Sequence, residues 1–186
     1  MFTGFCINIV RDTSFWFIYE NSLLTLYFLG YIPTFWASVD NEINLDPRDQ
    51  LFIPGGYPEL QEQINNLITR IGTRFRWLLT KTNSECGGYI MIAQWLSINL
   101  IRTKLLGFIP TINTCNNSLI FVVDKVGSLI DLGKICNGHE FHYVSEISKD
   151  NRPSQFISRS RYHMLLKGVK NNSIEGSYLH NVDIAR

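Results

Sequence analysis

The sequence predicts an α/β domain with a mostly parallel central sheet, helices on both of its faces, and an antiparallel extension in the C-terminal half. In the first half of the 186-residue chain, apolar runs of strand length alternate with a segment of helix length. Glycine-bearing loops follow apolar runs at 54–59 and 85–88, as at the ligand-binding edge of open α/β sheets. In the second half, Asn, Gly and Ser clusters separate the strand-like runs, which favours antiparallel pairing.

The composition indicates one globular domain spanning residues 1–186, because 45% of the residues are hydrophobic and 18% are charged. A net charge of +1 with scattered Lys and Arg argues against nucleic-acid binding. The apolar stretch Phe15–Trp36 contains Glu20, Asn21 and Pro33, so no membrane association is expected. The N-terminus lacks a signal-peptide pattern, and the four cysteines show neither a disulfide framework nor metal-ligand spacing. We therefore expect a reduced, cytoplasmic protein without a metal.

The first half contains three predicted strands, at Phe5–Val10, Tyr31–Val39 and Leu51–Ile53. A helix is expected over Phe15–Leu29, because Asp12, Thr13 and Ser14 suit its start and Gly30 suits its end. Its aromatic opening is expected to pack on the sheet, the alternative being a partner-facing patch. The next predicted elements are a helix over Leu60–Ile71, a buried strand over Phe75–Thr80 and a helix over Tyr89–Ile101.

The second half is predicted to be mainly strands. They are expected at Leu119–Val123, His139–Ile147 and Tyr162–Leu166, followed by a last short strand over Gly176–His180. Asp150–Ser160 is polar and is expected to form a surface loop.

A turn between a predicted strand and a predicted helix carries Cys86, in Glu85-Cys86-Gly87-Gly88. This arrangement resembles a nucleophile elbow, in which glycine permits the sharp turn and the helix N-terminus favours a thiolate. A lowered thiol pKa would make Cys86 a nucleophile at neutral pH. The alternative is a buried structural cysteine beside a helix start.

A second loop, Pro54-Gly55-Gly56-Tyr57-Pro58-Glu59, follows the third predicted strand. Its glycines leave backbone N–H groups unobstructed, so the amides near Gly56 and Gly87 are candidates for an oxyanion hole. The alternative is a tight turn before a helix. Neither this loop nor any other segment has the pattern of a phosphate-binding loop.

Two histidines lie in Gly138-His139-Glu140-Phe141-His142-Tyr143. Their spacing is a weak metal-ligand signal. In a strand, His139, Phe141 and Tyr143 point to one face while Glu140 and His142 point to the other, so one set is expected to face the cleft.

Taken together, these motifs resemble one family across nearly the whole chain. Ile53–Glu59, Glu85–Gly88, Gly138–Tyr143 and Ser177-Tyr178-Leu179-His180 occur in the order found in the glutamine amidotransferase domain of cobyrinic acid a,c-diamide synthase. The opening residues Arg11–Phe15 and Tyr19–Asn21 are also similar to the start of that domain. The resemblance implies a flavodoxin-like, class I amidotransferase fold.

The resemblance also implies a chemistry. Cys86 would be the nucleophile and His180 its base, and Gly55, Gly56, Tyr57, Gly87 and Gly88 would bind glutamine or its oxyanion. The ammonia would be passed to an ATP-activated carboxylate on a corrin ring. His139, Glu140 and His142 would line the cleft or fix its edge strand.

Two departures from the family pattern matter, one for the group that orients the histidine and one for the partners. Class I enzymes orient the histidine with a Glu two residues later, but Val182 stands here, which leaves Asp183 and Glu140 as candidate orienting groups. No phosphate loop is present, so we expect this chain to lack the synthetase domain and to bind no cofactor, with ATP and Mg²⁺ on a separate synthetase domain or partner chain. A catalytically quiet module that docks on a synthetase, or an amidotransferase for cobyric acid, nickel-sirohydrochlorin or cell-wall lipid, remains an alternative.

Overall fold

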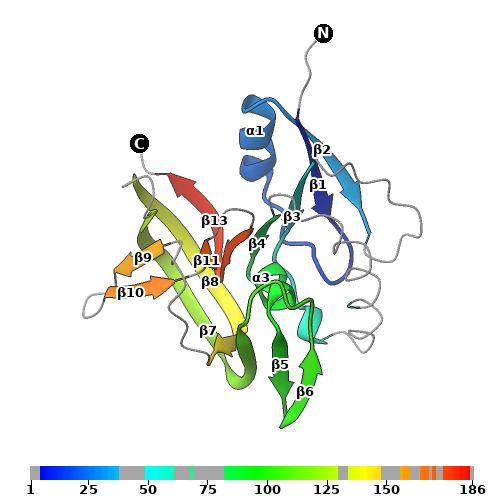
Figure 1. The fold of residues 1–186 in the computed structure, drawn as a ribbon. Helices are drawn as coiled ribbons and strands as arrows, with labels where there is room; N and C mark the ends of the chain where they lie inside the picture. The colour runs from blue at the N-terminus through cyan, green and yellow to red at the C-terminus, as the bar shows by residue number, and fades with distance from the viewer. Residues whose placement is uncertain are drawn as a thin grey trace.

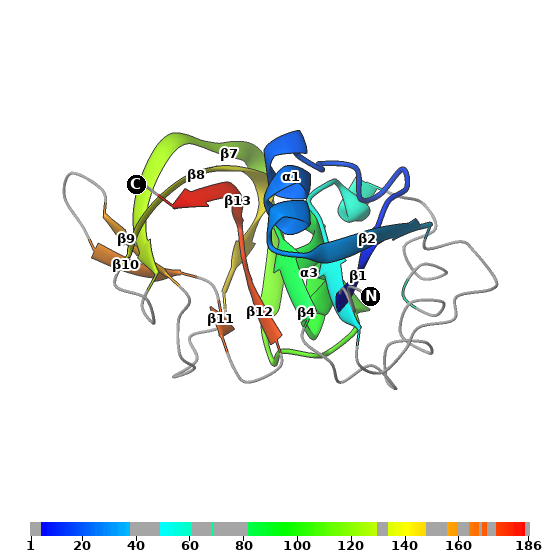
Figure 2. The ribbon, with the colours of Figure 1, turned by 90° about the horizontal axis from the view of Figure 1, so that it is seen from above.

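The chain folds into two sheets that meet along their sides (Figures 1 and 2). A computed structural model describes residues 5–37, 49–60, 68, 82–129, 134–147, 156–159, 164–167, 169–170 and 174–184. Within these ranges, residues 5, 121–137, 156–176 and 179–184 are described by their backbone alone.

The first sheet has six strands and is mostly parallel, as predicted. Its order is β11-β12-β4-β3-β1-β2, and the β11–β12 pair is antiparallel. The strands are β1 (Phe5–Val10), β2 (Tyr31–Trp36), β3 (Gln50–Ile53), β4 (Thr82–Glu85), β11 (Val169–Lys170) and β12 (Ile174–Ser177).

The second sheet has seven strands and forms the predicted antiparallel extension. Among its described strands, β5 and β7 are paired in parallel and the other pairs are antiparallel. β7 lies at its centre and pairs with β5, β8 and β9, while β8 also pairs with β13. The strands are β5 (Trp95–Ile98), β6 (Ile101–Lys104), β7 (Ile112–Leu129), β8 (Lys134–Glu146), β9 (Phe156–Arg159), β10 (Met164–Lys167) and β13 (Leu179–Ile184).

The first predicted helix ends where expected but begins later. Helix α1 spans Glu20–Phe28, so the predicted start at Phe15 is wrong. Asp12 instead closes a turn, because its Oδ1 accepts hydrogen bonds from the backbone N–H of Ser14 at 2.7 Å and of Phe15 at 3.1 Å. The next two residues cannot continue as helix, since the N–H groups of Trp16 and Phe17 both donate to the carbonyl of Gly55.

The elements around the two glycine loops differ from the prediction in length. The strand that leads into Cys86 is the polar β4, whereas the strand predicted over Phe75–Thr80 lies outside the described residues. Helix α3 covers only Gly87–Ile92, so the helix predicted to reach Ile101 is wrong. A short 3₁₀ helix, η1 (Pro58–Leu60), follows the first loop, and most of the helix predicted over Leu60–Ile71 lies outside the described residues.

The C-terminal part of the structure also differs from the prediction. β9 lies within the stretch predicted as a loop, and the last predicted strand is two strands that belong to different sheets, β12 and β13. Tyr178 separates these two strands.

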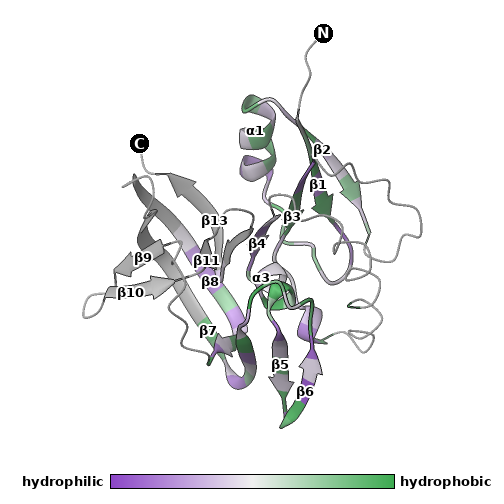
Figure 3. Cartoon of the chain, in the orientation of Figure 1, coloured by the Kyte–Doolittle hydropathy of each residue, from purple (hydrophilic) through white to green (hydrophobic). Residues whose placement is uncertain are grey.

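The main hydrophobic core surrounds α3. All six α3 residues are buried. The four residues after its two glycines share a core cluster with Val10 and Ile53 of the first sheet, Leu96 of the second sheet and Phe15 of the connection after β1. Figure 3 shows this apolar helix at the junction of the sheets. Burial of an entire helix at this point fixes the position of the residue that precedes it, which is Cys86.

The helices of the described ranges are all too short or too polar to cross a membrane.

Candidate active site

Cys86 occupies a strained turn between β4 and α3. Its backbone has φ +45° and ψ −104°, a conformation that non-glycine residues rarely adopt. Such strain persists only where the surroundings hold it, and it is characteristic of functional sites. Here the backbone N–H of Cys86 donates to the carbonyl of Ser177, the last residue of β12, at 2.8 Å.

The two glycines after Cys86 allow the turn to touch its neighbours. A Cβ on Gly88 would lie 2.1 Å from the carbonyl oxygen of Ile53, and a Cβ on Gly87 would lie 2.5 Å from that of Gly56. Any side chain at either position would therefore push the turn away from β3 and its following loop.

The loop after β3 is equally constrained. Gly56 has φ +156°, and a Cβ there would lie 1.9 Å from the carbonyl oxygen of Ser14. The backbone N–H groups of Gly87 and Gly56 both favour ionisation of the Cys86 thiol and so lower its pKa. The structure thus brings together at one sulfur the two amides that were predicted from separate motifs.

The other predicted glycines have different roles. The N–H of Gly88 donates to the carbonyl of Pro54 at 3.1 Å, and the carbonyl of Gly55 holds the N–H groups of Trp16 and Phe17. The N–H of Gly88 therefore supports the loop and is not directed at the thiol, and the carbonyl of Gly55 fixes the loop to the segment before α1.

The environment of the thiol corrects one expectation. Cys86 is only 1% exposed, and burial raises the pKa of its thiol well above the usual value, with the charge of Glu59 as the next cause. Its Sγ donates to the carbonyl of Phe141 in β8 at 3.5 Å. The expected lowering of the thiol pKa is thus wrong for this conformation, in which burial outweighs the two glycine amides.

Tyr57 joins the first loop to β8. Its ring contacts those of Phe141 and Tyr143 with centroids 6.3 Å apart in both cases, and it meets Phe17 at 5.4 Å. Burial, with the charge of Cys86 next, raises the pKa of Tyr57 to about 12. This aromatic cluster covers the same side of β8 as Cys86.

His139 lies beside the start of α1. Its Nε2 is 3.0 Å from the hydroxyl of Tyr19, and burial lowers the pKa of His139. Burial also raises the pKa of Tyr19 to about 12, followed by the charges of Glu85 and Cys86. The Tyr19–His139 contact thus joins the connection between β1 and β2 of the first sheet to β8 of the second sheet, near the thiol.

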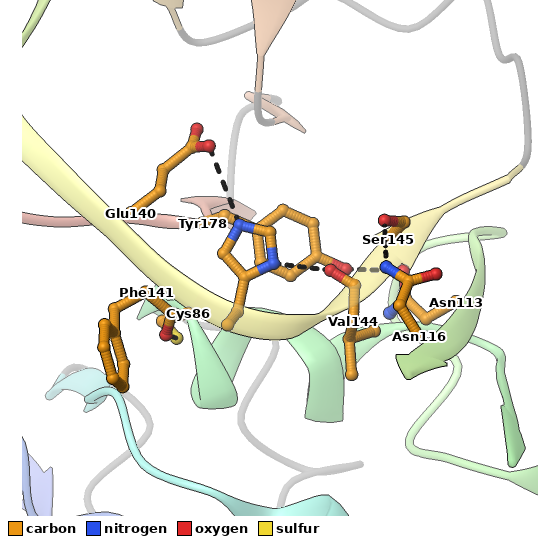
Figure 4. A network of polar contacts seen from close by, with 9 residues as sticks. Cys86, Asn113, Asn116, Glu140, Phe141, Val144, Ser145 and Tyr178 are labelled. Atoms are coloured by element: carbon orange, nitrogen blue, oxygen red, sulfur yellow. Dashed lines mark hydrogen bonds and ion pairs between the residues drawn. The ribbon is translucent and has the colours of Figure 1, made fainter. Parts of the chain in front are cut away.

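The predicted alternation along β8 is confirmed (Figure 4), because Glu140 lies on the face opposite Phe141 and Cys86. His142 Nε2 is 3.6 Å from Glu140 Oε2, and both side chains are buried. The His142 ring stacks on that of Tyr178, with centroids 4.1 Å apart.

Tyr178 anchors this second cluster. Its hydroxyl donates to Asn113 Oδ1 at 2.9 Å, and its ring meets Tyr89 of α3 edge-on at 5.1 Å. The motif Ser177–His180 predicts a functional role for its histidine. Nothing in that motif predicts that Tyr178 is buried.

Backbone pairing places His180 and Asp183 in β13. His180 lies opposite His139, and Asp183 lies opposite Asn137. The chain reaches β13 directly from Ser177, which is bonded to Cys86, so His180 follows three residues after that contact. Side chains of β13 are outside the described part, and the Cys86–His180 pair and the orienting role of Asp183 or Glu140 stay predictions.

The described ranges contain no group of three or more His, Cys, Asp or Glu side chains placed to hold a metal ion. The expectation of a chain without metal or cofactor stays a prediction.

Comparison with known proteins supports the motif-based resemblance. Residues 6–183 match the model of the CobB/CobQ-like glutamine amidotransferase domain. The chain is 28% identical over 193 residues to hydrogenobyrinate a,c-diamide synthase of Rhizobium meliloti, covering 95% of this chain and 43% of that protein. It is 27% identical over 183 residues to cobyrinate a,c-diamide synthase of Thermoplasma volcanium, covering 94% of this chain and 40% of that protein. The chain therefore spans less than half the length of these curated relatives.

Solved structures show the same fold. A glutamine amidotransferase of Thermotoga maritima superposes with a TM-score of 0.64 at 9% identity, over 95% of this chain and 76% of that chain. Another structure described as a glutamine amidotransferase gives a TM-score of 0.59 at 12% identity, over 94% of this chain and 89% of that one. The predicted class I amidotransferase fold is confirmed, and the chain belongs to the CobB/CobQ-like glutamine amidotransferase domain family.

Proposed function

We propose that this domain hydrolyses glutamine to glutamate and ammonia, with Cys86 as the nucleophile. The observation that carries the proposal is the strained turn at Cys86, with the N–H groups of Gly56 and Gly87 directed at its sulfur. Those two donors would stabilise the oxyanion of a tetrahedral intermediate, an effect of about 3 kcal/mol for a comparable donor.

The reaction proceeds in two steps. His180 takes the proton of the Cys86 thiol, and the thiolate attacks the carboxamide carbon of glutamine. The C–N bond then breaks, and ammonia leaves with the proton that His180 returns. Water then attacks the glutamyl thioester, which releases glutamate and returns the thiol. Because Sγ donates to the Phe141 carbonyl in the structure, glutamine must replace that contact when it binds.

The proposed destination of the ammonia is a carboxylate of cobyrinic or hydrogenobyrinic acid, in the ATP-dependent a,c-diamide formation of cobalamin biosynthesis. The support is the name of the relatives in Rhizobium meliloti and Thermoplasma volcanium. ATP and Mg²⁺ would bind to a synthetase domain or partner chain that activates the acceptor. We thus assign the step in which the activated carboxylate takes up ammonia to a synthetase domain or partner chain and not to the residues described above.

A second candidate function has one observation in its favour. The thiol is buried and its pKa is raised, as in an inert structural cysteine. On this alternative the domain docks on a synthetase without hydrolysing glutamine.

Ammonia release from glutamine separates the two candidates. We expect the wild-type chain to release ammonia, alone or with a cognate synthetase. Cys86→Ser should reduce the rate by at least about a thousandfold, because a serine hydroxyl is a much weaker acid and a weaker nucleophile than a thiol. Cys115→Ser is the matched control, since Cys115 is also a free cysteine but belongs to β7 and not to the turn. Equal rates in wild type and Cys86→Ser would favour the quiet module.

A further inference from the structure

Glu59 is a buried carboxylate that the proposed mechanism does not use. It lies in η1, three residues after Gly56, and is 8% exposed. η1 packs against α3, the helix that begins at the Cys86 turn. Glu59 therefore belongs to an element that follows the Gly56 loop and packs against the helix that contains Gly87, the two segments whose N–H groups act on the thiol.

This carboxylate has no compensating partner in the described part of the chain. Neither Oε1 nor Oε2 accepts a hydrogen bond from another residue there, and no cationic side chain is among the groups that act on its charge. Burial raises the pKa of Glu59 to about 7, and the residue's own backbone N–H opposes this only in part. A buried charge without a partner is costly, so its retention suggests a role other than stability.

In the described part of the chain, the charge of Glu59 raises the pKa of acidic groups. It raises the pKa values of four groups: Cys86, Tyr57, Cys115 and Tyr178. In the same order, these residues lie in the turn between β4 and α3, the loop after β3, strand β7 and the junction of β12 with β13. Glu85 of β4 adds a further negative charge on Cys86. In such a site, two negative charges on Glu59 and Cys86 would repel strongly, because little water is present to screen them.

We propose that Glu59 is a positioning residue of the Cys86 site and that its carboxylate and the Cys86 thiolate share a single negative charge. The thiolate then forms only when Glu59 holds a proton or contacts a cation. A proton that passes from the thiol to Glu59 keeps the charge of the pair at minus one, whereas a proton that Glu59 takes up from water leaves the pair neutral. The role in catalysis rests on the proposed glutaminase activity, whereas the charge sharing does not.

The direct test is the alkylation of Cys86 by iodoacetamide as a function of pH, followed by mass spectrometry of the Cys86 peptide. Glu59→Gln removes the charge and keeps the shape, so we expect alkylation at about pH 8 to become roughly tenfold faster and the curve to move to lower pH. Glu20→Gln removes an exposed charge at the start of α1 and should leave the curve unchanged. A Glu59→Gln curve that coincides with the wild-type curve would overturn the proposal.

A second variant distinguishes charge sharing from a structural role. Glu59→Met fills the same space with an apolar side chain, so it should fold with an equal or higher melting temperature and show the same faster alkylation. If both variants fail to fold, or if both lower the melting temperature without moving the alkylation curve, Glu59 is structural and the proposal fails.

The glutaminase reaction supplies an independent readout. The acid limb of the kcat/KM profile should move to lower pH in Glu59→Gln, because the thiolate forms more readily. A wild-type chain that releases no ammonia would refute the proposed function, yet a shifted alkylation curve in the same preparation would still support charge sharing.

Discussion

Gly88 shows how single residues decide whether the active turn can form. The carbonyl of Ile53 stands 2.1 Å from the position of an added Cβ, and it belongs to a central strand that cannot move freely. Gly107 offers a contrast, because its φ is +70° and nothing lies within 4 Å of an added Cβ. Glycine is required at position 88 because the Ile53 carbonyl lies too close for a side chain. At position 107 it is favoured only by the left-handed backbone conformation.

We therefore expect Gly88→Ala to lower the free energy of unfolding by about 3 kcal/mol or more, the range of severe overpacking. Gly107→Ala should cost only about 1 kcal/mol, the strain of a left-handed alanine. Urea denaturation of the two variants beside wild type measures both values. Equal losses would mean that the contact between Gly88 and Ile53 is not tight.

Glu59 makes a prediction about stability as well as reactivity. Its pKa rises from 4.5 to about 7 on folding, so the folded state binds more protons than the unfolded state between these values. The free energy of unfolding should therefore fall as pH increases through this window, by at most about 3 kcal/mol for this group.

Urea denaturation at about pH 5 and about pH 8 checks the sign. Since other groups also titrate, the decisive quantity is the difference between wild type and Glu59→Gln, which should grow with pH in favour of the variant. A difference that stays constant with pH would contradict the raised pKa.

At the scale of elements, local patterns predicted the first half better than the middle of the chain. β1 and β3 are close to prediction because their apolar runs are bounded by polar turns. The run after Cys86 was misassigned, since Tyr89 to Ile101 is apolar at helix length but contains a helix, a strand and a tight turn. Periodicity cannot separate a buried helix from a buried strand.

β4 was missed for a different reason. Its sequence, Thr-Asn-Ser-Glu, has no apolar residue, yet Thr82 and Ser84 are buried at the centre of the sheet. Backbone pairing with β3 and β12 holds this strand, and those partners come from distant parts of the sequence. No local signal could have shown this pairing.

The β5–β6 hairpin allows a stabilising substitution. Its turn residues Asn99 and Leu100 have φ +49° and +68°, as in a type I′ turn, where Asn-Gly is the preferred pair. Leu100 is 98% exposed, so its side chain contributes little packing. We expect Leu100→Gly to raise the free energy of unfolding by about 1 kcal/mol.

Leu100→Ala is the matched control, because it removes the same side chain but keeps a Cβ in the left-handed conformation. Thermal denaturation should rank Leu100→Gly above Leu100→Ala. The reverse order would show that the turn does not adopt positive φ at this position.

At the scale of the whole molecule, the candidate site is assembled where two sheets meet. The first sheet supplies Cys86 and the Gly56 loop, and β8 of the second sheet supplies the carbonyl that accepts a hydrogen bond from the thiol. The order of motifs along the chain predicted the family and the residues to examine. The raised thiol pKa and the role of Tyr178 depend on contacts between distant segments, which the order of motifs does not encode.

The central claim is that Cys86 attacks the side-chain amide of glutamine. Its most direct test is labelling with 6-diazo-5-oxo-L-norleucine, a glutamine-like diazoketone that alkylates a nucleophilic thiol after binding as glutamine does. We expect mass spectrometry to find the adduct on Cys86, with protection by excess glutamine and no adduct in Cys86→Ser. An intact Cys86, or labelling that glutamine does not prevent, would contradict the account.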